Sequence, residues 1–446
     1  MPDRLRILFV SQVPPSPPRY GAQVRIHGLM TAVAERHEVS AVCCAASEEE
    51  AEAAREAMRA YCREVEIVVD PTSEDWLRKR LLQARSLASL HCFERHLFTT
   101  AWMQRRLDAV LSAGRHDAVI AEGPFVVHHR FRTAPPGAPP PRLVLDEHNV
   151  EWDVSRQVAR RGVTLARRIY GSLNWRKMRR EEEAAWGRVD AVTVTSARDE
   201  ARVLAARPRA RVAVVPNAVD VDRCRPLPGD PPPDRSTLLF FGALDYAPNS
   251  DGLGFFLDEV WPRVLATHPG ARLRILGRKA PPWLAARRAP GVELGGFVED
   301  LRPAIAAAGA VIVPLRLGGG TRLKILEAMA MAKPIVSTRI GAEGLVVAHG
   351  RELLVADRAV DFAAEVRRLL DDPALGDRLG RAARALVETR YAWRASAAIL
   401  DRLLMELCGP PARGGATARA SGRGRSSTTA RPRPPPPAAP PWPPPP

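Results

Sequence analysis

Residues 310–344, AVIVPLRLGGGTRLKILEAMAMAKPIVSTRIGAEG, carry the pattern that decides the fold. The apolar run Val311–Leu315 predicts a buried strand, and the glycines Gly318–Gly320 follow it. An amphipathic helix with one acid, Glu327, comes next, and the apolar run Pro334–Ser337 predicts a second strand. A strand, a glycine turn and a helix in this order present backbone N–H groups and a helix N-terminus to a phosphate. The pattern therefore predicts an anion or nucleotide site at the carboxyl end of a strand.

Short apolar runs alternate with helix-period segments, such as Val24–Arg36 and Ala101–Ala113, along the rest of the chain. In the first half the runs are Leu5–Val10, Val39–Cys43, Val65–Val69, Val119–Ala121, Leu143–Asp146, Ala191–Val194 and Val212–Val215. In the second half they are Leu238–Phe241, Leu273–Leu276, Val292–Leu294 and the two runs named above. Near-continuous apolar strands with helices between them are typical of a parallel sheet covered on both faces. The chain is therefore expected to be an α/β protein with doubly wound, Rossmann-like domains.

One proline-rich segment predicts where the chain divides. Residues 223–237, RCRPLPGDPPPDRST, indicate a linker between a first domain at 1–222 and a second domain at 238–388. Two doubly wound domains joined in this way place a cleft between the carboxyl ends of their sheets. Residues 409–446 are rich in glycine, arginine and proline and are expected to be a disordered tail.

Composition and charge limit the class of protein. The chain is 46% hydrophobic, yet it holds no run of about 18 apolar residues that would span a membrane. An apolar strand begins near the N-terminus without a signal-peptide pattern, so we expect a cytoplasmic protein. The formal net charge is +16, but no nucleic-acid-binding motif accompanies it. The expected anionic partners are a nucleotide-sugar diphosphate or lipid headgroups, and not nucleic acid.

The cysteines and histidines give no metal-binding pattern. Six cysteines contain no CxxC pair, and ten histidines contain no HExxH motif. We therefore expect reduced thiols, no bound metal and no cofactor.

The segment from Gly295 to Gly344 resembles the donor-binding motif of GT-B glycosyltransferases, particularly the large retaining family 4. The resemblance implies that Glu327, the second acid of a Glu-x7-Glu pair, accepts hydrogen bonds from the ribose hydroxyls of a nucleotide sugar. A capping role is assigned to Thr321 at the start of its helix. Family members have a last helix that crosses back onto the first domain, which matches residues 389–408.

The chain departs from the family pattern at two positions. Gly319 stands where most members have the glutamate that faces the donor sugar, and the GGGT loop resembles a subgroup without that acid. Ala243 replaces the arginine of a diphosphate clamp, and the lysine that follows it in the family is missing here. The cations that could replace this clamp are Arg322, Lys324, Arg278 and Lys279, because guanidinium and ammonium groups both bind phosphate.

In the first domain, Tyr20-Gly21-Ala22-Gln23 resembles the family's glycine loop, and Arg25 adds charge one turn later. His148, in LVLDEHNVEWD, matches a histidine that lies near the donor sugar in family 4. Asp146 and Glu147 are the alternatives for activating the acceptor. Ser196 and Asn217 resemble family segments as well, although helix capping or turn formation is a sufficient role for both.

The predicted catalytic residues are therefore His148, Arg322 and Lys324. The predicted donor contacts are Gly21, Gly242, Arg278, Phe297, Gly318, Gly319, Gly320, Thr321 and Glu327.

An arginine-rich helix over residues 156–188 suggests contact with an anionic membrane surface. Trp175 and Tyr170 are the side chains expected at the headgroup interface. A solvated helix whose acids balance its bases is the alternative interpretation.

The resemblance implies a metal-independent glycosyltransferase that retains anomeric configuration. It would move a sugar from a nucleotide-diphosphate donor to a polysaccharide, a lipid-linked sugar or a small molecule. Two alternatives stay open: a catalytically degenerate partner in a polysaccharide assembly complex, and a sugar-nucleotide 2-epimerase.

Overall fold

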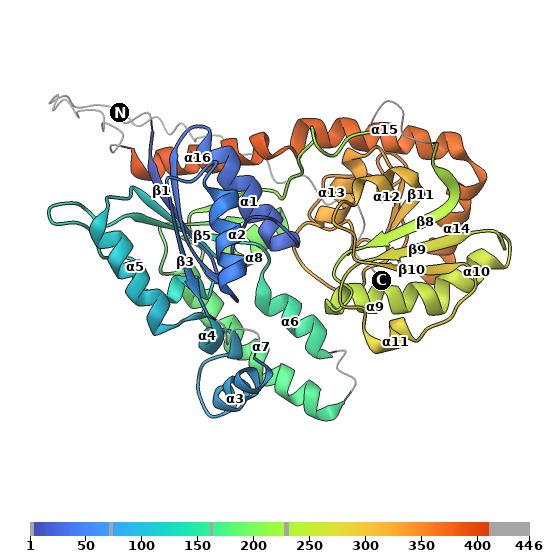
Figure 1. The fold of residues 1–446 in the computed structure, drawn as a ribbon. Coiled ribbons are helices and arrows are strands. Elements are labelled where there is room, and N and C mark those ends of the chain that lie inside the picture. The colour runs from blue at the N-terminus through green and yellow to red at the C-terminus, as the bar shows by residue number, and fades with distance from the viewer. Residues whose placement is uncertain (1–3, 71–74, 161–163, 227–231, 410–446) are drawn as a thin grey trace, which may run out of the picture.

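Two parallel β-sheets organise the chain (Figure 1). The computed structural model describes residues 4–70, 75–160, 164–226 and 232–409. We call the part of the chain that builds the first sheet the first domain, and the part that builds the second sheet the second domain.

The first sheet has the strand order β3-β2-β1-β4-β5-β6-β7, with every described pair parallel. Its strands are β1 Arg6–Val10, β2 Glu38–Ala45, β3 Glu64–Val69, β4 Ala118–Glu122, β5 Arg142–Glu147, β6 Ala191–Val194 and β7 Val212–Val214. The second sheet has the order β10-β9-β8-β11-β12-β13 and is also parallel. Its strands are β8 Asp234–Phe241, β9 Arg272–Leu276, β10 Val292–Gly296, β11 Ala308–Val313, β12 Ile335–Ser337 and β13 Leu354–Val355.

Helices cover both faces of each sheet. The first domain holds α1 Gly21–Ala34, α2 Glu48–Met58, α3 Trp76–Leu87, α4 Phe93–Phe98, α5 Ala101–Ala113, the 3₁₀ turn η1 Val126–His128, α6 Glu151–Arg160, α7 Leu165–Trp186 and α8 Ala197–Ala206. The second domain holds α9 Ala247–Phe255, the π-helical turn η2 Phe256–Val260, α10 Trp261–Leu265, α11 Pro282–Ala285, α12 Arg302–Ala307, α13 Leu323–Ala330, α14 Ala359–Asp371 and α15 Pro373–Arg390. The last helix is α16 Trp393–Cys408.

The α/β architecture predicted from the apolar runs is confirmed. Each predicted strand is present, β6 with the predicted bounds and the others with shifted ends, because strands buried on both faces need apolar side chains at successive positions. The strand β11, for example, is buried along its whole length. The short strand β13 was not predicted.

The helix α16 packs against α1 in the first domain, while α15 lies along the second domain beside α13 (Figure 1). The contact with α1 is close because Gly28 leaves room for the Trp393 ring. Leu400, Leu403 and Leu404 of α16 join the hydrophobic core of the first domain.

The prediction of one arginine-rich helix over 156–188 is wrong. The described residues form two helices, α6 and α7, and Thr164 caps the second by accepting a hydrogen bond from the Arg167 N–H. The two helices pack side by side, since Gly171 approaches Ala159 closely and Trp175 lies 6.4 Å from Trp152 between ring centroids.

The predicted linker and the predicted tail are described only in part. β8 begins at Asp234, inside the segment that the sequence suggests as a linker. Residues 227–231 of that segment and residues 410–446 of the predicted tail lie outside the described residues. All six cysteines are free thiols, as expected.

Candidate functional site

The glycine loop, residues 318–320, leaves the carboxyl end of β11 and leads into α13. Gly318 and Gly320 have φ values of 130° and 65°, a backbone region that favours glycine. A side chain at Gly320 would meet the His148 carbonyl and the Asn149 amide of the first domain. The glycines therefore let the two domains approach each other at this loop.

Arg322 folds back over the glycine loop. Its Nη1 donates hydrogen bonds to the carbonyls of Gly319 and Gly320. Its Nε and Nη2 are buried and have no hydrogen-bond partner among the described residues. Burial lowers the pKa of this guanidinium. The expectation that Thr321 caps α13 is wrong, because the helix begins one residue later with Arg322 at the N-cap.

Lys324 and Gly242 lie together at the loop, although they are far apart in sequence. The Lys324 Nζ is 4.1 Å from the centroid of the Phe240 ring and donates a 2.8 Å hydrogen bond to Asn249 Oδ1. A Cβ on Gly242 would lie 3.1 Å from this Nζ, and the φ of Gly242 is 139°. Burial, followed by the nearby Arg322 charge, lowers the pKa of Lys324 to about 7. Asn249 was not predicted as a site residue.

Glu327 lies in the second turn of α13, as predicted. Burial raises the pKa of its carboxyl to about 7, although the charges of Lys324 and Arg223 oppose this shift. Within the described part of the chain, Lys324 acts on Glu327 through its charge and forms no ion pair with it. A surface salt bridge to Lys324 therefore does not account for this acid.

Tyr20 and Gly21 of the first domain lie against the second domain. Gly21 opens α1, and a Cβ there would be 3.5 Å from Leu323 Cδ1 at the start of α13. The Arg278 guanidinium of the second domain lies 5.1 Å from the centroid of the Tyr20 ring. Two other predicted residues, Phe297 and Lys279, have exposed side chains, and the exposed fraction of Phe297 is 59%.

His148 sits between two buried carboxylates at the carboxyl ends of β4 and β5. Its Nε2 is 2.8 Å from Glu122 Oε2 and 3.5 Å from Asp146 Oδ2. Burial disfavours the charged ring, but both carboxylates outweigh it and raise the pKa of His148 to about 9. Burial and repulsion from Asp146 raise the pKa of Glu122 to about 7. Glu122 was missed from the sequence, although its place at a strand's carboxyl end could have indicated it.

Asp146 and Glu147 face opposite sides of the sheet, as alternation along a strand requires. Arg25 binds Asp146 with two hydrogen bonds of 2.8 and 2.6 Å, and it holds the pKa of that carboxyl below its ordinary value against the effect of burial. Glu147 instead accepts a 3.4 Å hydrogen bond from Trp186, and burial beside the Glu182 carboxylate raises its pKa. Arg25 is therefore used inside the first domain, and the expectation that it adds free charge for a phosphate is wrong.

Asn217 connects this cluster to the second domain. Its Oδ1 accepts a 2.9 Å hydrogen bond from Arg25, and its Nδ2 donates a 3.0 Å hydrogen bond to the Thr321 carbonyl. Turn formation alone is therefore not its role. Ser196 does have the expected capping role, because its side chain accepts a hydrogen bond from the Asp199 N–H at the start of α8.

The helix α6 of the first domain closes over the glycine loop. Gln157 accepts a 3.0 Å hydrogen bond from the Gly318 N–H and donates one of 3.1 Å to the Gly318 carbonyl. Asp153 holds the Gln157 amide at 2.9 Å. A Cβ on Gly319 would lie 3.2 Å from Val154 Cγ2, so α6 fills the space toward which a glutamate at this position would extend. None of these contacts was predicted.

Glu122, Asp146 and His148 offer ligand atoms that lie within 4.8 Å of one another, as in a metal site. The charge of this cluster is already balanced by the protein, because Arg25 occupies both oxygens of Asp146. The donor set therefore fits an ion-paired network better than a divalent cation.

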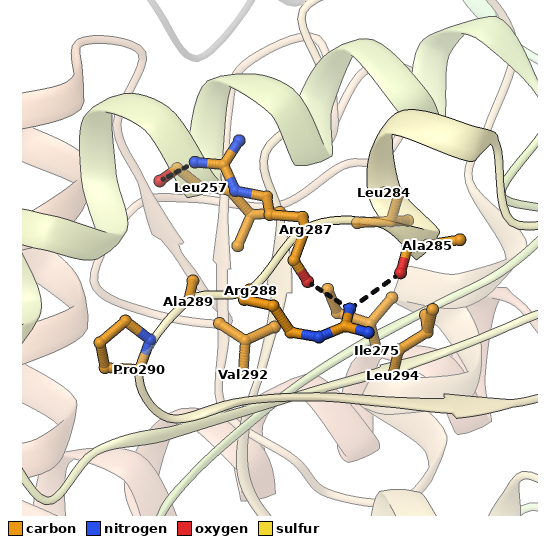
Figure 2. Close-up of a pocket in the computed structure, with 10 residues that line it drawn as sticks. All are labelled: Leu257, Ile275, Leu284, Ala285, Arg287, Arg288, Ala289, Pro290, Val292 and Leu294. Carbon is orange, nitrogen blue, oxygen red and sulfur yellow. Dashed lines mark hydrogen bonds between the residues drawn. The ribbon is translucent and has the colours of Figure 1, made fainter.

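A separate cavity of about 420 Å³ opens at the edge of the second sheet (Figure 2). Its lining comes from η2, β9, α11, β10 and the loop before β10, and includes Leu257, Ile275, Leu284 and Leu294. Arg287 and Arg288 at this cavity donate to backbone carbonyls of Leu257, Ala285 and Arg287. No residue of the glycine loop lines it.

Comparison with known proteins gives matches to the second domain and to the whole fold. Residues 235–372 match the family model described as "Glycosyl transferases group 1". Glycogen synthase of Mycobacterium tuberculosis (strain ATCC 25618 / H37Rv) is 31% identical over 195 residues, which are 42% of this chain and 46% of that protein. D-inositol 3-phosphate glycosyltransferase of Arthrobacter sp. (strain FB24) is 40% identical over 79 residues, 17% of this chain and 18% of that protein. The chain thus spans less than half the length of these curated relatives.

Two solved structures have the same fold at low identity. Anabaena HepE in complex with UDP and glucose has a TM-score of 0.60 at 15% identity, covering 90% of this chain and 99% of that chain. TarM has a TM-score of 0.64 at 10% identity, covering 91% and 99%. The chain therefore has the two-domain fold of GT-B proteins, and its second domain matches the group 1 glycosyl transferases.

Proposed function

We propose that this protein is a glycosyltransferase that uses a nucleoside-diphosphate-sugar donor. The observation that carries the proposal is the pair of cations, Arg322 and Lys324, beside the glycine loop. Arg322 keeps two buried N–H groups without a partner in the described residues, and Lys324 has a pKa lowered by burial. Neither side chain forms an ion pair within the described residues, and two desolvated cationic groups favour a bound anion, which a diphosphate supplies. The name of the family model that matches residues 235–372 supports the same chemistry.

The roles of the other candidate residues follow from their places around the glycine loop. Glu327 would accept hydrogen bonds from the ribose hydroxyls, and His148 would contact the donor sugar from the first domain. We propose retention of anomeric configuration, no requirement for a metal, and a glycan, lipid-linked sugar or small molecule as acceptor. UDP in the solved complex of Anabaena HepE supports a nucleotide as the donor's leaving group.

The proposal is tested by calorimetric titration with UDP, GDP and ADP and with their sugar derivatives. Lys324 has a pKa of about 7 in the free protein, so above pH 7 it is mostly neutral. A bound diphosphate favours the ammonium form, so binding takes up as much as about one proton and affinity falls by up to about tenfold for each pH unit. Titration in two buffers of different ionisation enthalpy measures this uptake.

Lys324→Met is the matched variant, and its proton uptake above pH 7 is expected to vanish. Binding of no nucleotide would contradict the proposal and favour the degenerate partner. Conversion of the donor into an epimeric sugar nucleotide without an acceptor would favour the 2-epimerase.

We also propose that the first domain contacts anionic lipid through a surface made by α3 and the first half of α7, which we call the α3/α7 surface. The two helices are joined where Tyr170 meets Ser86 at 3.3 Å between hydroxyl oxygens. Their exposed apolar side chains are Trp76, Leu77, Leu81, Leu87, Leu165, Ile169 and Leu173. Arginine and lysine residues at 78–80 and arginines at 167–168 lie on the same helices. Apolar side chains among basic ones suit an anionic interface.

The side chains proposed here for the lipid interface are not Trp175 and Tyr170, the two expected from the sequence. Trp175 packs against Trp152, and Tyr170 hydrogen bonds within the protein, so neither side chain is free to enter a headgroup layer. In the described part of the chain, no helix has both the length and the apolar character needed to cross a bilayer. Contact at the surface is the form of association that this geometry supports.

Vesicle sedimentation tests the α3/α7 surface. The protein is expected to sediment with vesicles that contain phosphatidylglycerol, less at high salt, and not with phosphatidylcholine alone. Trp76→Ser with Leu165→Ser should weaken binding by about tenfold or more, since exposed side chains of this size contribute roughly 1 kcal/mol or more each when buried. Val360→Ser on α14, which is similarly exposed, is the control. Equal losses in both variants would contradict the proposal.

A further inference from the structure

Glu122 is a buried acid, and only one of its carboxylate oxygens has a hydrogen-bond partner among the described residues. It is the last residue of β4 and pairs in register with Asp146 of β5, so both carboxylates reach the same edge of the sheet. Only 4% of the residue is exposed. Its Oε2 makes the 2.8 Å contact with His148 Nε2, whereas its Oε1 is buried and has no partner in the described part of the structure.

The charged groups around His148 come from four elements. Asp146 on β5 is neutralised by Arg25 on α1, which binds both of its oxygens. Glu151 on α6 is also nearby, and burial raises the pKa of its carboxyl. Glu122 on β4 has no arginine or lysine in contact among the described residues, so His148 is its cationic partner.

Because Nε2 is bound to Glu122, Nδ1 is the ring nitrogen left for a ligand. We propose that Glu122 is a positioning residue that fixes the ring of His148 and keeps it doubly protonated, so that Nδ1–H is presented as a hydrogen-bond donor to an oxygen of the donor sugar. This inference rests on the proposed function for its ligand, but the Glu122–His148 pairing itself does not. A carboxylate in contact with an imidazole favours its charged form, in which both ring nitrogens carry a proton.

The test is an NMR titration of the full chain, with the His148 signal identified by its loss in His148→Gln. In the wild type we expect His148 to titrate with a pKa of about 9. In Glu122→Gln the pKa should fall by about 1 to 3 pH units, because an adjacent opposite charge raises a histidine pKa by about that amount. Donor-sugar affinity should weaken above the new pKa, while affinity for the nucleotide without its sugar stays unchanged.

Glu122→Asp should restore part of the shift. Asp401→Asn removes the partner of a different histidine, His37 at 2.7 Å, and should leave the His148 signal unchanged. An unshifted His148 titration in a folded Glu122→Gln protein would overturn the inference. Failure of the wild type to bind any nucleotide would instead contradict the proposed function, and the titration would still report on Glu122.

Discussion

Glu327→Ala is expected to weaken nucleotide binding about 100-fold or more. The carboxylate lies half-buried on α13, where burial raises its pKa to about 7. A hydrogen bond to a charged group contributes about 1.5–3 kcal/mol, and two ribose hydroxyls would donate to this one carboxylate. Calorimetry with whichever of UDP, GDP and ADP binds the wild type measures the loss, and Glu293→Ala on the edge strand β10 serves as the control.

The ribose assignment has a sharper test. The 2′-deoxy and 3′-deoxy nucleotides should bind the wild type more weakly than the parent nucleotide does. In Glu327→Ala the difference between parent and deoxy forms should disappear, because the partner of the missing hydroxyl is already gone. A difference that persists in the variant would show that Glu327 acts elsewhere.

Arg322→Ala is expected to lower the rate of sugar transfer about 10²- to 10³-fold, the usual effect of removing one donor that stabilises developing charge. Its two unpartnered N–H groups are buried beside the glycine loop, so they are available for the diphosphate as it leaves. The effect should fall mainly on kcat, since the leaving group gains charge in the transition state.

Arg322→Lys should recover only part of this rate, because an ammonium group lacks the bidentate geometry of guanidinium. Arg368→Ala, on the exposed side of α14, is the matched control and should leave kcat unchanged. A variant that changes KM for the donor with unchanged kcat would contradict the role in leaving-group stabilisation.

Elements with a strong local pattern could be predicted from the sequence. The strands are buried on both faces and appear as apolar runs, and the glycine loop with its helix was located because φ values near 130° and 65° require glycine. Helix ends were less predictable. The start of α7 after Thr164, whose backbone is extended and whose side chain caps the helix, was not recognised in the sequence.

Residues that act through distant partners could not be predicted. Arg25 looked like a free cation near a glycine loop, but the structure pairs it with Asp146, which is 121 positions away. Gln157 and Asn249 have polar side chains on helices, where solvation is the usual outcome. Their partners, Gly318 and Lys324, belong to other segments, so only the fold brings these pairs together.

The segment that follows β7 and the segment between α15 and α16 lie against each other where the two domains meet. The Val219 N–H donates a 2.9 Å hydrogen bond to the Tyr391 carbonyl, and Ser396 Oγ donates one of 2.9 Å to the Pro216 carbonyl. Because both connecting segments lie at this one place, rotation of the domains about it is easier than translation of one domain along the other. We therefore expect the two domains to open by a rotation about this place, which breaks the hydrogen bonds between Gln157 and Gly318.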